Sequence, residues 1–166
     1  MKIAYPFIPK GRKIYYVPDS NSFIRVAAAY AYAYSLDDYM PNASIIVKQN
    51  KILGLAANGS DYHKSHPCRR KLLGIPTGQG YELCEGCHPK HHSEGKAIAD
   101  AQKKHNPVKG ADLYLWGHWW CCEPCWENIN KAGISNVYLL KGSAVLFNRE
   151  VEGNIVGNQF QHWLKH

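Results

Sequence analysis

The chain has 166 residues, of which 45% are apolar and 20% are charged, so it is long enough for one compact domain and too short for two comfortable ones. No apolar run approaches the roughly 18 residues that a membrane-spanning helix needs, and residues 1–10 lack the continuous apolar stretch of a signal peptide. We therefore expect a single domain over 1–166 in a cytoplasmic protein. The net charge of +7 fits an anionic partner such as a nucleotide or nucleic acid, and it equally fits a surface charged only for solubility.

An extended arm is predicted at the start of the chain, because three prolines fall within it. Beyond Asn21 the chain is rich in alanine and tyrosine over 23–40, which predicts a largely buried helix. Ser20 or Ser22 can cap the start of this helix, and Pro41 cannot continue it.

A β-hairpin is predicted next, with strands over 42–49 and 52–57 joined by a turn at Asn50-Lys51. The second half of the chain alternates between helical and strand patterns. Its predicted elements are a helix at 92–105, a strand at 112–116, a helix at 123–131, a strand at 136–140 and a helix at 159–165. This order predicts a three-layer α/β protein.

Residues 60–91 form a predicted insert that is rich in glycine and poor in apolar residues. A loop of this length inside a compact domain is usually functional or tied down. A second, structural zinc can tie it down, because a metal clip offsets the entropy of ordering a long polar loop. The candidate ligands are Cys68, Cys84, Cys87 and His91, with His63, His66 and His88 as alternates for the histidine. The alternative is a set of free cysteines in an irregular loop.

The most informative pattern is a histidine followed about thirty residues later by a cysteine pair. His92, Cys122 and Cys125 offer one imidazole and two thiolates, and three protein ligands leave a fourth zinc position open for water, as in catalytic sites. Glu94 lies two residues after His92, so its carboxylate can reach the open position without being a ligand. Zinc lowers the pKa of bound water from about 15.7 to near 7, and a neighbouring carboxylate can move the protons.

Two other interpretations of the cysteine pairs stay open. Cys84/Cys87 and Cys122/Cys125 can together form a four-cysteine structural zinc site, although the pairs lie farther apart than the roughly 15–20 residues usual in zinc ribbons. That site would also leave His92 and Glu94 without a purpose. A thioredoxin-like redox role lacks the βαβ context expected before the pair.

The sequence resembles the cytidine deaminase superfamily, and within it the deoxycytidylate deaminases, over roughly 22–140. The matching segments are ASIIVKQNKILGLAANGS, HHSEGKAIADA and CCEPCWENINKAGISNVYLL. They are similar to that family's first hairpin with its Asn-Gly end, to its His-Ala-Glu helix, and to its Pro-Cys-x-x-Cys helix with the following strand. Such a His-x-Glu motif with a later Cys-x-x-Cys is the signature of zinc deaminases that act on nucleobases.

The resemblance implies a three-layer α-β-α fold with a central mixed sheet. It also implies hydrolytic deamination of a cytosine nucleotide, with dCMP to dUMP as the leading case. In that reaction a zinc-bound hydroxide attacks C4 of the base and Glu94 shuttles protons. Asn58 would contact the substrate sugar, and the backbone N–H of Ser93 would bind the base carbonyl. A homo-oligomer is the default expectation for such a protein.

The sequence departs from the family pattern beside the predicted ligands. Cys121 stands where the family has proline, so it competes with Cys122 as a ligand. Ser93 replaces the usual alanine, and the turn at 117–120 is about two residues longer than usual. Because this turn borders the predicted pocket, the substrate preference is open there.

Several further residues have two interpretations. Arg69 and Arg70 can bind a substrate phosphate or form a solvated surface. Trp116, Trp119 and Trp120 can stack on a base or pack in the core.

Rival functions also remain. They are a deaminase of tRNA or single-stranded DNA, a deaminase of a free nucleoside or base, and a zinc-stapled nucleic-acid-binding module without catalysis. Glu94 disfavours the last one, because a binding module needs no carboxylate there. The arm and the C-terminal helix suggest no function.

Overall fold

The computed structural model describes residues 7–165, and its centre is a five-stranded mixed sheet of order β1-β5-β4-β2-β3. The strands are β1 (Ile14–Val17), β2 (Ala43–Lys48), β3 (Lys51–Ala57), β4 (Asp112–Trp116) and β5 (Asn136–Leu140). Strand β2 pairs antiparallel with β3 and β4, whereas β5 pairs parallel with β4 and β1. The predicted mixed sheet is therefore confirmed.

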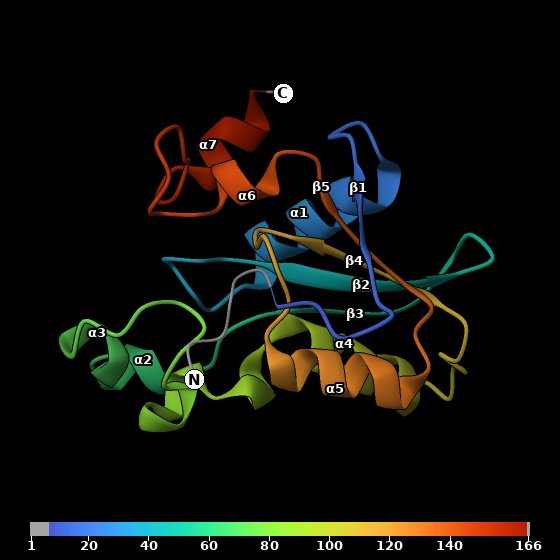
Figure 1. The fold of residues 1–166 in the computed structure, drawn as a ribbon, viewed down its shortest axis with the longest axis horizontal. Coiled ribbons are helices and arrows are strands. Elements are labelled where there is room, and N and C mark those ends of the chain that lie inside the picture. Colours follow the sequence, from blue (N-terminus) through green and yellow to red (C-terminus); the bar gives the residue numbers. More distant parts are fainter. Residues whose placement is uncertain (1–6, 166) are drawn as a thin grey trace.

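Helices cover both faces of the sheet, which gives the predicted three layers (Figure 1). On one face lie α4 (Ser93–Lys103) and α5 (Glu123–Ala132). On the other lie α1 (Ser22–Tyr34), α6 (Ser143–Leu146) and α7 (Gln159–Leu164). The insert carries only short elements, which are α2 (Tyr62–Ser65), α3 (Arg69–Leu72) and the 3₁₀ helices η1 (Tyr81–Leu83), η2 (Glu85–Cys87) and η3 (Pro89–His91).

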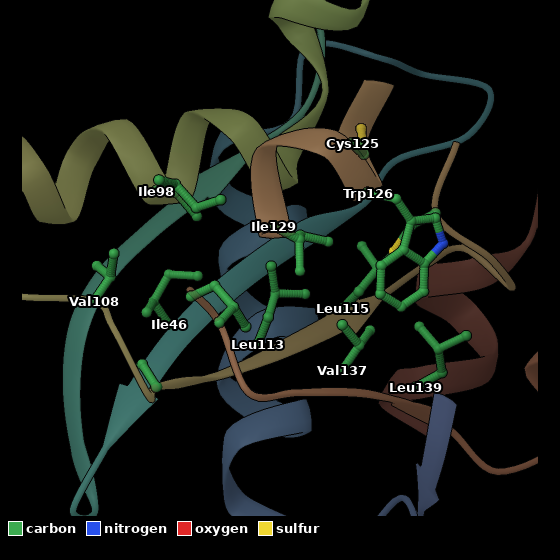
Figure 2. Packing of buried hydrophobic residues seen from close by; sticks show 14 of the residues in the cluster. Ile46, Ile98, Val108, Leu113, Leu115, Cys125, Trp126, Ile129, Val137 and Leu139 are labelled. Carbon is green, nitrogen blue, oxygen red and sulfur yellow. The ribbon is translucent and has the colours of Figure 1, made fainter. Parts of the chain in front are cut away.

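Alternating side chains of the central strands divide the core in two. Leu113 and Leu115 of β4 pack beneath α4 and α5, as Figure 2 shows, together with Ile98 and Ile129 of those helices. Tyr114 and Trp116 point to the opposite face and pack with α1 and the C-terminal helices. Because successive side chains of a strand point to opposite faces, one sheet contributes to both apolar layers.

Gly54 of β3 sets the close approach of α4 to the sheet. A Cβ at this position would lie 2.6 Å from the carbonyl oxygen of Ala97 and 2.6 Å from the backbone nitrogen of Ala101. Both of these alanines are completely buried. Gly54 therefore lets α4 lie close against the backbone of β3. Any larger residue at this position would push α4, and with it His92, away from the sheet.

The start of the chain differs from the sequence-based expectation in two ways. The predicted extended arm contains β1, which pairs in parallel with β5 at the edge of the sheet. The cap of α1 is Asn21 and neither neighbouring serine, because its Oδ1 accepts hydrogen bonds from the backbone nitrogens of Phe23 and Ile24, each at 3.0 Å.

Helix α1 also ends at Tyr34, earlier than the predicted end near residue 40. Ser35 is already extended, with ψ of 135°. The backbone nitrogen of Leu36 then donates to the carbonyl oxygen of Asn58 at 3.0 Å. Oδ1 of Asp37 accepts hydrogen bonds from the backbone nitrogens of residues 39 and 40, each at 2.9 Å. Tertiary contacts with the end of β3 thus override the helical pattern.

The hairpin forms as predicted, with its turn shifted by one residue to Gln49 and Asn50, whose φ values are 50° and 64°. The three later elements β4, α5 and β5 follow their predicted limits closely, and Gly133 ends α5 in the left-handed region. Across residues 7–165, none of the helices combines the length and apolar character that crossing a membrane requires.

Candidate metal centre and catalytic pocket

His92, Cys122 and Cys125 meet where α4 and α5 begin. His92 and Cys122 are the residues that cap the two helices, and Cys125 lies in the first turn of α5. Because α4 and α5 lie side by side on one face of the sheet, their starts bring together residues that are thirty positions apart in the chain (Figure 1). We call these three residues the metal centre.

The distances within the metal centre fit one bound zinc ion. Nδ1 of His92 lies 3.3 Å from Sγ of Cys122 and 3.4 Å from Sγ of Cys125, and the two sulfurs are 3.2 Å apart. Zinc binds thiolate sulfur at about 2.3 Å and imidazole nitrogen at about 2.0–2.1 Å, so donors that share one ion lie within about 4.6 Å of each other. All three separations meet this limit.

The surroundings of Cys122 favour its metal-binding form. Hydrogen bonds from Cys125 and His92 outweigh burial and lower the pKa of Cys122 to about 5. Although burial opposes a charged imidazole, the hydrogen bond and the charge of Cys122 raise the pKa of His92. The thiol is therefore ionised at neutral pH, which is the form that binds metal.

Glu94 is buried beside the metal centre, with only 5% of its surface exposed. Burial raises the pKa of its carboxyl group, and the charge of Cys122 adds to this effect. Cys121 donates a hydrogen bond from its thiol to this carboxylate. Cys121 therefore contacts Glu94 and stands outside the group of three possible ligands, so the geometry favours Cys122 as the ligand.

Ser93 and Asn58 are both held by structural hydrogen bonds. The hydroxyl of Ser93 donates to Oδ1 of Asn42 at 2.8 Å and lies 2.8 Å from the hydroxyl of Ser44, which ties the start of α4 to β2. Oδ1 of Asn58 accepts from the hydroxyl of Ser35 at 2.6 Å and from the backbone nitrogen of Asn42 at 2.9 Å. The sugar contact of Asn58 and the backbone contact of Ser93 with a base stay predictions.

A pocket of about 610 Å³ opens beside Cys122. It is lined by residues 78–82 and 88–89 of the insert together with residues 120 and 122–124. This volume lies within the roughly 300–1,000 Å³ usual for small-molecule sites. The insert therefore forms part of the candidate site, although no sequence pattern pointed to residues 78–82.

The three candidate tryptophans have different surroundings. Trp116 is buried on the opposite face of the sheet, 5.3 Å from the ring of Phe147, so it is a core residue and not a stacking platform. Trp120 lines the pocket. Trp119 is half-buried and packs against both layers of the core.

A second cluster of metal-binding side chains lies in the insert, and we call it the insert cluster. Its members, whose candidate donor atoms all lie within 4.8 Å of one another, are His63, Cys68, Cys84 and Cys87. His91, the histidine expected from the sequence, instead points Nε2 toward the carboxylate of Glu85 at 3.7 Å. His63, one of the alternates from the sequence, lies beside the cysteines because α2 contacts η2, where Gly86 leaves room for the His63 ring; a Cβ at Gly86 would lie 2.5 Å from that ring.

The two candidate phosphate-binding residues, Arg69 and Arg70, differ in their surroundings. The guanidinium of Arg70 donates to the carbonyl oxygens of Gln79 at 2.8 Å and Pro76 at 2.9 Å and lies 4.4 Å from the centre of the Tyr81 ring. It is therefore part of the structure of the insert. Arg69 is exposed.

Comparison with known proteins agrees with this geometry. The family model for the cytidine and deoxycytidylate deaminase zinc-binding region matches residues 18–141, which include the metal centre and Glu94. No curated protein matches the chain.

Three solved structures illustrate the similarity. A dCMP deaminase from the cyanophage S-TIM5 is 21% identical, with 71% of this chain and 79% of that chain covered and a TM-score of 0.48. A structure from work on tRNA:A34 deaminases is 20% identical, with 70% and 72% covered and a TM-score of 0.46. A guanine deaminase from Bacillus subtilis is 18% identical, with 72% and 62% covered and a TM-score of 0.44. Since the family model spans most of the sequence, the chain belongs to the zinc-binding cytidine and deoxycytidylate deaminase family.

Proposed function

We propose that this deaminase converts a cytosine nucleotide to the uracil nucleotide and ammonia, with dCMP as the substrate. The observation that carries the proposal is the grouping of the metal centre with buried Glu94, together with a pocket large enough for a nucleotide that Cys122 of this centre lines. The sequence resemblance to deoxycytidylate deaminases supports dCMP over other cytosine compounds.

The residues divide the chemistry between them. His92, Cys122 and Cys125 would hold zinc, which when bound supplies a water nucleophilic at neutral pH. Glu94 takes a proton from that water and delivers it to the ring nitrogen next to C4. The water oxygen bonds to C4 in this step, and Glu94 then moves the remaining proton from the new C4 hydroxyl to the amino group, so that the C4–N bond breaks, ammonia leaves and the C4 carbonyl of the uracil forms. A carboxyl group whose pKa is raised by burial is suited to hold a proton between these steps.

The start of α4 would orient the base. Its first backbone N–H groups have no partner inside the helix, and that of Ser93 is among them. The hydrogen bonds of the Ser93 hydroxyl to β2 fix this position. A base carbonyl can accept from this N–H, which would place C4 toward the metal centre.

Ammonia release from a panel of substrates tests the proposal. The panel contains dCMP, dCTP, CMP, deoxycytidine, cytosine, single-stranded DNA and tRNA. We expect dCMP to give the highest kcat/KM. Activity on deoxycytidine equal to that on dCMP would contradict a nucleotide substrate, and silence on every cytosine compound would contradict the reaction.

A deaminase of nucleic acid is the second candidate. The net charge of +7 and the exposed side chains of Arg69 and Lys71 on the insert favour it, because phosphate contacts dominate the affinity for nucleic acid. In the panel, this candidate predicts activity on tRNA or single-stranded DNA and none on dCMP.

The insert cluster would hold a second zinc. It has three sulfurs and one nitrogen, the closed four-ligand set of a structural site. Burial opposes ionisation of the Cys84 thiol, but hydrogen bonds from His63 and from backbone N–H groups bring its pKa down to about 6. We therefore expect two zinc ions per chain.

A further inference from the structure

The insert contacts the metal centre at its histidine. The His92 ring is hydrogen-bonded to the backbone of Cys87, and the ring of Tyr81 packs edge-on against it, with centroids 4.9 Å apart and an angle of 82°. Nδ1 of His92 faces the two sulfurs, and the Cys87 backbone is the acceptor for a hydrogen bond from the same ring. Such an acceptor fixes the ring orientation of a metal-binding histidine.

Tyr81 is held in place from two sides. The guanidinium of Arg70 lies over its ring at 4.4 Å, and its phenol oxygen accepts a hydrogen bond from the backbone nitrogen of Gly78 at 3.0 Å. Arg70 is itself fixed by the carbonyl oxygens of Pro76 and Gln79. The loop that lines the pocket is therefore wrapped around one arginine–tyrosine pair.

Each of these contacts lies next to a member of the insert cluster. Arg70 follows Cys68 by two residues, and Tyr81 precedes Cys84 by three, with the Cys84 backbone nitrogen donating to the Tyr81 carbonyl at 3.3 Å. Cys87 contributes a sulfur to the cluster and a carbonyl to His92. The elements of this region are only three or four residues long, so they have little helical stability of their own.

We infer that a metal ion on the insert cluster builds the wall of the catalytic pocket and holds His92 in place, with Tyr81 as the residue of that wall that determines substrate affinity. The aromatic ring offers a planar base an apolar surface beside the metal centre. The role of Tyr81 rests on the proposed function, whereas the hold on His92 does not.

Zinc content and zinc release test the hold on His92. We expect two zinc ions per chain in the wild type and in His66→Ala, and one in His63→Ala. His66 is the matched control, because it is an exposed histidine of the same insert that lies outside the cluster. His63→Cys keeps four donors and should restore the second ion.

Zinc release to a chelator is measured over time. The phase that is missing in His92→Ala is assigned to the metal centre and is compared between variants. In His63→Ala we expect this phase to be about 10- to 100-fold faster, the usual effect of losing the support of a metal ligand. Wild-type release with only one zinc bound would overturn the inference, as would two zinc ions in His63→Ala. Failure of His63→Cys to restore slow release would also overturn it.

Kinetics with dCMP test Tyr81. Tyr81→Ala should raise KM about tenfold with kcat changed less than about threefold, which is the signature of lost binding rather than lost chemistry. Tyr81→Phe should keep the wild-type KM, and His63→Ala should share the KM of Tyr81→Ala. A wild-type KM in Tyr81→Ala would overturn the role of this residue. If the wild type deaminates nothing, the proposed function fails, and the zinc-release comparison still decides the hold on His92.

Discussion

Cys122 shows how the chain prepares a metal ligand at neutral pH. Its sulfur is hydrogen-bonded with Cys125 at 3.2 Å and with His92 at 3.3 Å at the start of α5, and these contacts lower its pKa to about 5. The partial positive charge at a helix N-terminus acts in the same direction. Zinc binding at pH 7 therefore does not have to remove a proton from this sulfur.

We therefore expect the amount of zinc bound to the metal centre to depend on pH. A thiol whose pKa is lowered to about 5 is ionised above that pH, so protons compete with the metal for this sulfur only at pH 5 and below, and we expect zinc to be held at pH 6–8. Zinc content after dialysis at stepped pH measures this. Loss of half of the zinc at pH 7 or above would contradict the pKa of Cys122.

The residues of the metal centre could be predicted from the sequence because their spacing sets them at helix starts. His63 could not be selected over His91, since the path of the insert between short helices decides which histidine returns to the cysteines. Tyr81 gave no signal at all. Its contact with His92 joins two segments through tertiary packing that no local pattern encodes.

Helix α1 is capped by Asn21, whereas the sequence pattern favours the neighbouring Ser20 or Ser22. We expect Asn21→Ala to lower the free energy of unfolding by about 1 kcal/mol, because two backbone N–H groups lose their acceptor. Urea denaturation measures the change. Ser20→Ala is the matched control and should be close to neutral; equal losses in both variants would contradict Asn21 as the cap.

The contact of α4 with β3 depends on Gly54. We expect Gly54→Ala to destabilise the protein by about 1–3 kcal/mol, because its Cβ would meet backbone atoms of α4 that cannot move independently. Urea denaturation and the kinetics of zinc release both report this change.

Gly95→Ala provides the control on the same helix. Its Cβ would meet only the Asn128 side-chain amide at 3.2 Å, which can rotate away, and alanine favours a helix. This variant should be neutral or more stable. A Gly54→Ala protein as stable as the wild type would show that α4 can shift freely on the sheet.

At the scale of elements, the sequence predicted what local patterns encode. Strand β4, helix α5 and strand β5 lie within a residue of their predicted limits, because alternation and a terminal glycine define them. The end of α1 and the pairing of β1 were missed. Both depend on partners far away in the chain, the end of β3 and the edge strand β5.

The whole molecule carries a net charge of +7, which attracts anionic substrates of either kind. The dependence of affinity on salt concentration separates the two candidate functions. A nucleotide with one bound phosphate loses about fourfold in affinity or less between 50 and 200 mM salt, whereas a polymer with six phosphate contacts loses about 10³-fold. We expect the shallow dependence for KM with dCMP. A steep dependence, measured with tRNA or single-stranded DNA as the preferred substrate, would favour the second candidate.

We propose that this chain hydrolyses the amino group of dCMP with Glu94 as the proton carrier. The most direct measurement is the incorporation of ¹⁸O from labelled water into dUMP, made on wild type and Glu94→Gln with zinc content determined for both. We predict one ¹⁸O per dUMP in the wild type and a rate lower by about 10²- to 10⁴-fold in Glu94→Gln at unchanged zinc content. Unlabelled dUMP, or full activity in the variant, would contradict the account.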